Sequence, residues 1–201
     1  SMNVIRGKLD YIDRKEALRY AGYLGIAAGE AGKESSALFD ECEKIMLETL
    51  SPAAVYSPFP LSRGEGAHLN LGFAEVESKS LQRNLVGCNK IVLFAATLGI
   101  GPDRLIAKYN RISPARAAVM QALGAAAAEQ WCDIVNERIT RQYGPSRPRF
   151  SCGYGDLPLR LQREIFPALQ VTKNIGVTLT DGDLMMPEKS VTAIVGILEN
   201  N

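Results

Sequence analysis

The sequence has 201 residues, of which 46% are hydrophobic and 22% are charged, and its formal net charge at pH 7 is +1. A chain of this size and balance can bury a full core without disulfides or metals. The nearly neutral charge argues against broad electrostatic binding to nucleic acid or membranes. The longest apolar stretch, residues 91–101, is too short to span a bilayer, and no basic-then-apolar leader precedes it. We therefore expect one cytoplasmic domain over residues 2–201.

The cysteines and the single histidine argue against a structural zinc site. Cys42, Cys88, Cys132 and Cys152 lie far apart in the sequence, and the only histidine is His68. Zinc ligands usually come in close pairs, so we expect reduced, mostly buried thiols and no metal ligands. A lone histidine, which we expect in a loop or at a strand end, also disfavours histidine-based acid–base catalysis.

The first half of the chain alternates between predicted helices and strands. Asp13 and Glu16 have the spacing of a capping box, and the continuous apolar run at 90–99 predicts a strand buried on both faces. In chain order we expect a lead-in strand at 3–12, a helix at 13–23 that loosens at 21–25, a helix at 34–50, strands at 53–61 and 69–76, a short helix at 81–85 capped by Ser78 or Ser80, and the buried strand at 90–99.

The second half contains the longest predicted helix, which begins at Ser113 and Pro114 and ends near residue 144. Serine at the cap and proline at the first position favour this start. No charged residue occurs between Arg116 and Glu129, which indicates a helix buried on more than one side. The other expected elements are a helix at 102–109, a helix at 157–169 capped by Asp156, and strands at 176–180 and 190–198. This mixed order predicts an α+β fold with a mainly antiparallel sheet, flanking helices and one long buried helix.

The segment from Arg149 to Asp156 is a candidate small-molecule site. A guanidinium fork suits a carboxylate or a phosphate. Gly153 and Gly155 permit close backbone approach or positive φ, and Tyr154 between them offers a ring face and a hydroxyl. Such a set suits a zwitterionic or cationic ligand, but the same residue types also build ordinary structural loops. The residues alone leave both interpretations open.

Three other features carry weaker signals. Glu129 lies roughly 200° around the long helix from Trp131, so it is either the first solvated position or the partner of a buried cation. Gly99-Ile-Gly101 lies between a strand and a helix as a phosphate loop does, but it lacks the third glycine and the Lys-Ser/Thr of the stronger motifs. We expect Met185 and Met186 to belong to the core.

At its R-x-x-x-G-Y pattern, residues 149–154, the sequence resembles the activation (reactivation) domain of cobalamin-dependent methionine synthase. Two further motifs follow in the same order. The pattern K-x-I-G-x-x-L-T at 173–180 is similar to a strand segment of that family, and M-x-P-x-x-S-V at 185–191 is similar to its signature near the end. The residues Ala-Thr-Leu-Gly at 96–99 and the long helix also have counterparts. The resemblance covers residues 85–198 and extends less clearly over 2–84.

The resemblance implies an α+β fold that binds S-adenosylmethionine. In such domains the arginine of the R-x-x-x-G-Y motif holds the methionyl carboxylate, and here that residue is Arg149. The matching glycine and tyrosine are Gly153 and Tyr154. Glu129 stands where the family has a helix carboxylate in the same pocket, and Cys152 stands where the motif often has proline. No residue is assigned a catalytic role.

The implied activity is reductive methylation, in which oxidised cob(II)alamin receives an electron and is remethylated by S-adenosylmethionine. The folate, homocysteine and corrinoid modules of full-length synthases are absent from this sequence. We therefore expect a free-standing partner of a separate corrinoid-binding methyltransferase, served by a flavodoxin-like or other reductant. Two alternatives stay open. One is a non-catalytic module that docks on a corrinoid protein, favoured by the aliphatic Ile194 and Val195 in place of the family's aromatic pair. The other is a methyltransferase that uses another acceptor.

Overall fold

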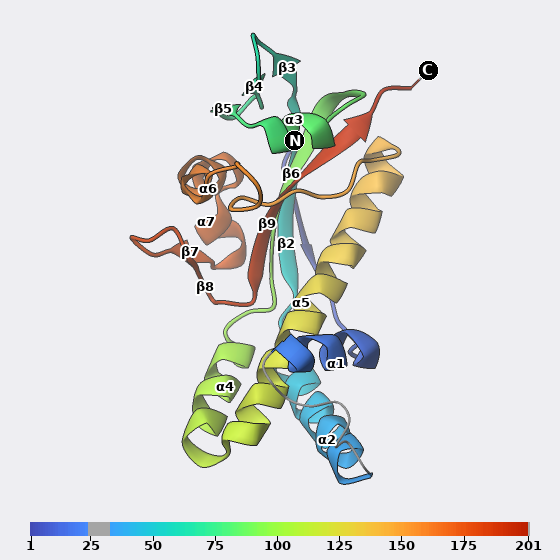
Figure 1. Ribbon diagram of the computed structural model, residues 1–201, viewed down its shortest axis with the longest axis vertical. Helices are drawn as coiled ribbons and strands as arrows, with labels where there is room; N and C mark the ends of the chain where they lie inside the picture. The colour runs from blue at the N-terminus through green and yellow to red at the C-terminus, as the bar shows by residue number, and fades with distance from the viewer. Residues whose placement is uncertain (24–32, 201) are drawn as a thin grey trace.

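A four-stranded antiparallel sheet in the order β1-β2-β6-β9 forms the centre of the protein in the computed structural model, which describes residues 1–23 and 33–200 (Figure 1). β6 pairs with β2 on one side and with β9 on the other. Its side chains alternate between two separate cores, which explains its continuous apolar sequence. The strands are β1 (Asn3–Arg6), β2 (Ala53–Pro60), β6 (Cys88–Thr97) and β9 (Ser190–Leu198).

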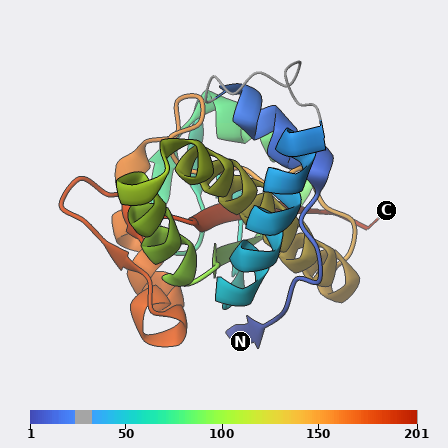
Figure 2. The same ribbon diagram turned by 90° about the horizontal axis from the view of Figure 1, so that it is seen from below.

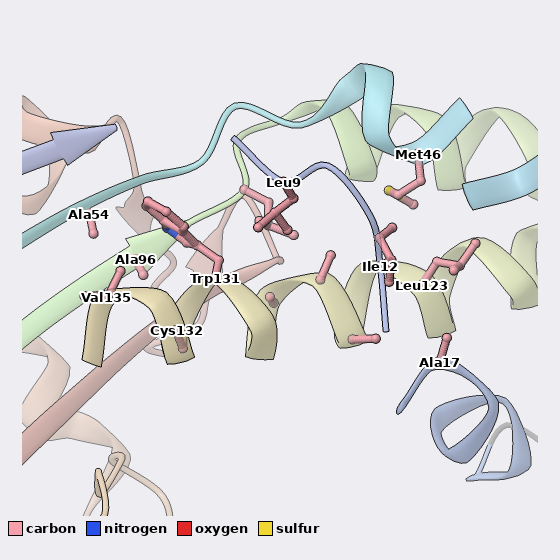
Figure 3. Packing of buried hydrophobic residues seen from close by; sticks show 14 of the residues in the cluster. Leu9, Ile12, Ala17, Met46, Ala54, Ala96, Leu123, Trp131, Cys132 and Val135 are labelled. Carbon is pink, nitrogen blue, oxygen red and sulfur yellow. The ribbon is translucent and has the colours of Figure 1, made fainter. Parts of the chain in front are cut away.

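The long helix α5 covers one face of the sheet, and three further helices pack against α5 and share the first core. The long helix α5 crosses this face, and the other three gather around its N-terminal part (Figures 1 and 2). Trp131 of α5 points towards Ala54 and Ala96 of the sheet (Figure 3), and its indole N–H donates to the Ala53 carbonyl at 3.0 Å. The helices are α1 (Arg14–Tyr23), α2 (Lys33–Thr49), α4 (Gly101–Ile112) and α5 (Pro114–Tyr143).

Shorter elements cover the opposite face and enclose the second core. Two small antiparallel sheets, β3-β4-β5 and β7-β8, lie here with three short helices and a 3-10 turn. Their bounds are β3 (Ser62–Arg63), β4 (His68–Asn70), β5 (Glu75–Glu77), α3 (Lys79–Asn84), η2 (Leu159–Leu161), α6 (Gln162–Leu169), α7 (Val171–Ile175), β7 (Thr178–Leu179) and β8 (Met185–Met186). The predicted α+β fold with one long buried helix is confirmed.

The caps predicted for α1 and α5 are present. The Asp13 side chain accepts from the Glu16 amide at 3.0 Å. The Ser113 hydroxyl accepts from the Arg116 amide at 3.3 Å, and α5 ends at Gly144, whose φ of 107° is costly for other residues. The loosening expected at 21–25 is wrong for residues 21–23, which belong to α1, and residues 24 and 25 lie outside the described residues. The lead-in strand is shorter than predicted and ends at Arg6.

The single strand predicted at 69–76 is wrong, because the chain turns in its middle. Gly72 has a φ of 83°, and its amide donates to the Asn70 side chain at 2.9 Å. A Cβ at this glycine would lie 2.8 Å from the Pro60 ring. The segment therefore folds back as β4 and β5, which pair with each other, and His68 begins β4 at a strand end as expected.

The helix predicted at 157–169 with an Asp156 cap is also wrong at its start. Pro158 is extended, with φ −70° and ψ 140°, and only a 3-10 turn precedes α6. The Asp156 carboxylate instead lies at the N-terminus of α3, where it accepts from the Ser78 hydroxyl and from the amides of Lys79 and Ser80 at 2.8 and 3.1 Å. Hydrogen bonds from the Ser78 hydroxyl and these amides hold the pKa of Asp156 far below its usual value.

The expectations for sulfur residues are mostly confirmed. Cys42, Cys88 and Cys132 are buried, Cys152 is half-buried, and all four are free thiols. Met185 packs against the second core, but Met186 is 41% exposed and does not belong to the core as predicted. No described helix combines the length and apolar character that crossing a membrane requires.

Candidate functional site

The segment after α5 carries the predicted site because it runs along the edge of the sheet. The Phe150 amide donates to the Ile194 carbonyl at 2.9 Å, and the Ile194 amide donates to the Phe150 carbonyl at 2.8 Å. The backbone amide of Arg147 donates to the Gly196 carbonyl at 2.9 Å. Successive side chains of an extended segment face opposite sides. Phe150 therefore enters the second core, and Arg149 reaches α5 on the other side.

Arg149 is held between two carboxylates of α5. Its Nη2 donates to Glu129 Oε2 at 2.8 Å and its Nη1 donates to Asp133 Oδ1 at 2.7 Å. Its side chain is 22% exposed, against 45% for Glu129 and 71% for Asp133. Burial alone favours the neutral form, but the hydrogen bond that Arg149 donates to Asp133 and the charge and hydrogen-bond acceptance of Glu129 raise the pKa of Arg149 above its ordinary value. The guanidinium is thus fixed in position and permanently charged.

Tyr154 stands out from the surface on a glycine-flanked turn. Gly153 and Gly155 have φ values of 86° and 56°, and a Cβ at Gly155 would lie 2.4 Å from the Ser80 hydroxyl oxygen. This turn leaves the Tyr154 side chain 71% exposed, with its ring edge-on to Phe150 at a centroid distance of 5.3 Å. The ring is supported on one edge and free to meet a ligand.

Arg149, Glu129 and Tyr154 line one hollow of about 470 Å³, which Asn84, Pro148, Phe150, Ser151 and Val191 complete. Its volume is in the range of small-molecule pockets, about 300–1,000 Å³. It combines an aromatic ring, a cation and a carboxylate, a set that suits a ligand with charges of both signs. These three residues of the predicted site are therefore brought together.

Cys152 and Gly153 are not among the residues that line this hollow. Cys152 packs against the second core, where burial raises the pKa of its thiol to about 12, so it remains a neutral thiol. The Gly153 amide donates to the Leu157 carbonyl at 2.8 Å, which closes the turn that presents Tyr154. Both residues shape the loop rather than face the hollow.

Two residues of the site were not singled out from the sequence. Asp133 follows Glu129 by four positions, which places both on one face of a helix, so helical spacing alone signals it. Asn84 comes from α3, far away in sequence, and no local pattern marks it. Its side-chain N–H donates to the Pro148 carbonyl at 2.8 Å, while its buried Oδ1 finds no hydrogen-bond partner among the described residues.

The other candidates have structural explanations. A Cβ at Gly101 would lie 2.1 Å from the Thr49 carbonyl oxygen, and one at Gly99 would lie 3.2 Å from Ser51 Cβ. Close packing of this connection against the end of α2 thus accounts for the glycines without a phosphate. Within residues 1–23 and 33–200, no three His, Cys, Asp or Glu side chains are grouped as metal ligands.

No family model and no curated protein sequence matches the chain. Among solved structures, it is similar to the MetH reactivation domain bound to AdoHcy, with a TM-score of 0.74 over 100% of this chain and 79% of that chain. The chain has the fold of the MetH reactivation domain. Sequence identity in this match is 18%. The similarity therefore establishes the fold, including residues 2–84, where the sequence resemblance was weaker.

Proposed function

We propose that this protein binds S-adenosylmethionine in the hollow between α5 and the segment at 145–157, and that it supports reductive methylation of a corrinoid carried by a separate protein. The observation that carries the proposal is the grouping of Arg149, Glu129 and Tyr154 around one hollow, on a fold that in the MetH reactivation domain binds AdoHcy. The electron would come from a separate reductant of the flavodoxin-like or another class.

The charges of the hollow match those of the ligand. S-adenosylmethionine carries a carboxylate, an ammonium and a sulfonium. The Arg149 fork is suited to the carboxylate. Glu129, whose Oε2 lies 2.8 Å from Arg149 Nη2, balances a positive group of the ligand, and the exposed ring of Tyr154 offers a face to a cation.

The role of the chain in this proposal is placement. Bound S-adenosylmethionine supplies a sulfonium methyl group as an electrophile. The side chains around the hollow bind and orient the methionyl part, so that the methyl is presented from an exposed edge of the protein. Holding two reactants in a productive geometry is itself a large contribution to rate, and it requires no acid or base from this chain.

One observation favours the non-catalytic alternative, a module that docks on a corrinoid protein without using a ligand. Each terminal nitrogen of Arg149 already donates to a carboxylate of its own protein, as in a purely structural ion-pair network. The aliphatic residues Ile194 and Val195 give this alternative less support. Both are buried, one in each core, and neither lines the hollow.

Isothermal titration of the folded protein with S-adenosylmethionine tests the proposal. Saturable binding at one site is expected, and no heat at millimolar ligand would exclude the proposal. Incubation with a cobalamin-loaded methyltransferase, a reductant and methyl-labelled ligand then separates the two functions. Label transfer to cobalt that depends on this protein supports reductive methylation, whereas co-purification without transfer supports the docking module.

A further inference from the structure

Three carboxylates follow one another along the surface of α5. Glu129, Asp133 and Glu137 are spaced four residues apart, so they lie on one side of the helix and repel each other. Arg149 donates to the first two, whereas Arg141 pairs with Glu137. One arginine therefore serves two acids at the ligand end of the row, and the group formed by Arg149, Glu129 and Asp133 has a net charge of −1.

Asp133 stands on the far side of Arg149 from the ligand hollow. Glu129 lines the hollow with Tyr154, whereas Asp133 lines a neighbouring hollow of about 620 Å³ in which Arg149 is again part of the wall. A ligand in the first hollow therefore does not have to displace Asp133, and only the guanidinium of Arg149 separates the ligand from the Asp133 carboxylate. The negative charge remains when the ligand binds.

The surface beyond Asp133 does not cancel this charge. Asp13 lines a third hollow together with Asp133, and the other acids of that hollow, Asp10 and Glu137, are paired with Lys8 at 3.7 Å and with Arg141. The field that reaches the ligand hollow from this side is therefore negative.

We propose that Asp133 is a specificity-determining residue that makes the site favour the sulfonium ligand over the corresponding thioether. This inference rests on the proposed function and deepens it. S-adenosylmethionine has a net charge of +1 at neutral pH, and S-adenosylhomocysteine, which lacks the sulfonium methyl, has a net charge of 0. The two share the adenosine, the ammonium and the carboxylate. The group formed by Arg149, Glu129 and Asp133, with its net charge of −1, favours binding of the first and release of the demethylated product.

The size of the preference follows from exposure. Asp133 is 71% exposed, so water and salt screen its charge strongly. Exposed ion pairs in direct contact change equilibria by at most roughly fivefold. Because Asp133 acts across the guanidinium of Arg149, we expect a smaller change, of about twofold. Among the charges near the hollow, Asp133 can be neutralised with little disturbance. Asn at this position has the same shape, and its side-chain oxygen still accepts the hydrogen bond from Arg149 Nη1.

The test compares the dissociation constants of S-adenosylmethionine and S-adenosylhomocysteine for the wild-type protein and for Asp133→Asn. The ratio of the two constants cancels any effect on the shared carboxylate or on the loop. We expect the preference for the sulfonium ligand to fall by about twofold in Asp133→Asn. In the wild type it should also weaken with added salt. Glu137→Gln is the matched control, because it removes the next acid of the same row, which pairs with Arg141, and its ratio should stay close to that of the wild type.

The outcomes separate the two proposals. Binding of both ligands with an unchanged ratio in Asp133→Asn overturns the role of Asp133 and leaves the proposed function standing. An equal loss of affinity for both ligands gives Asp133 a purely structural role and overturns the inference as well. Failure of the folded wild type to bind either ligand overturns the proposed function and the inference together.

Discussion

From Ala117 to Ala128, α5 is packed on several sides, whereas from Glu129 onward it keeps one packed side and carries acids on the other. The first half meets α1, α2 and α4, and small residues allow this close approach. On another side of α5, a Cβ at Gly124 would lie 3.0 Å from Cε of Lys189, which directly precedes β9. The second half passes beside the segment at 145–157, where Arg149 reaches Glu129. One continuous helix thus serves as core in one half and as the wall of a ligand hollow in the other.

This difference shows where function can be found on a buried helix. Where α5 is enclosed, its sequence is dictated by packing and leaves no room for charge. Where one side of α5 is exposed, Glu129 and Asp133 lie four residues apart on that side, and their partner Arg149 comes from the segment that follows the helix. Changes in the two halves should therefore separate stability from ligand binding, and the following predictions are ordered by the size of the effect expected.

The largest effect is expected for Leu123→Ala in the first half of α5. Leu123 is fully buried, and the cavity left by its truncation should lower the free energy of unfolding by about 2–5 kcal/mol, with ligand affinity unchanged in the folded protein. Urea unfolding measures the loss. Ile134→Ala in the second half is the control, because Ile134 is 40% exposed and should cost much less. Equal losses would contradict the division of the helix into two halves.

Arg149→Ala should act mainly on binding. Loss of a charge-assisted hydrogen-bonded pair should weaken S-adenosylmethionine binding by about 1.5–3 kcal/mol, as measured by isothermal titration at low salt. Arg141→Ala removes an arginine of α5 that pairs with Glu137 at the surface, and its affinity should match the wild type. Equal losses of affinity in both variants would mean that the loss of any positive charge weakens binding, and would contradict a direct contact between Arg149 and the ligand carboxylate. Circular dichroism establishes that each variant is folded.

Tyr154→Ala should have a smaller effect. Because its ring is 71% exposed, the free energy of unfolding should change little, while loss of a cation–π contact should reduce affinity by about 0.5–1 kcal/mol. Tyr11→Ala offers a matched change at another exposed tyrosine, one that lines the hollow near Lys8. Competition binding against labelled S-adenosylmethionine resolves differences of this size. An affinity equal to that of the wild type would remove Tyr154 from the site.

Asp156→Asn should lower stability near neutral pH and make little difference in acid. Because the pKa of Asp156 is lowered in the folded protein by the hydrogen bonds from Ser78, Lys79 and Ser80, its carboxylate stabilises the fold above the ordinary Asp pKa of about 4. That contribution is lost as the pH falls below this value towards the lower folded pKa. Urea midpoints at pH 6, 4 and 3 should fall less steeply in Asp156→Asn than in the wild type. A parallel decline in the two proteins would contradict the account of this cap.

Local signals predicted the parts of the fold whose causes are local. Ser113, Pro114 and Gly144 mark both ends of α5, and the apolar run of β6 indicated burial on both faces; both elements formed as expected. The Asp156 cap was assigned to the wrong helix because its true partners, at Ser78 to Ser80, lie more than 70 residues away in sequence. A short-range pattern contains no information about that contact.

The site was predictable to the same degree. Arg149, Glu129 and Tyr154 were candidates from the sequence, although the residue types alone also fitted an ordinary loop and a solvated helix position. The family resemblance supplied their roles in a shared pocket. Asp133 was overlooked, since an exposed acid on a helix is most often only solvated. Its significance depends on where Arg149 lies, which is set by the pairing of residues 145–150 with β9.

The most direct measurement of the central claim is an isotope-filtered nuclear Overhauser experiment with S-adenosylmethionine carrying a ¹³C-labelled sulfonium methyl. The account predicts contacts from this methyl to the ring protons of Tyr154, and their loss in Arg149→Ala under conditions where the wild type is saturated. Contacts instead to residues of another hollow, such as the one lined by Val76, Pro158 and Leu161, would contradict the claim that the ligand binds beside Arg149.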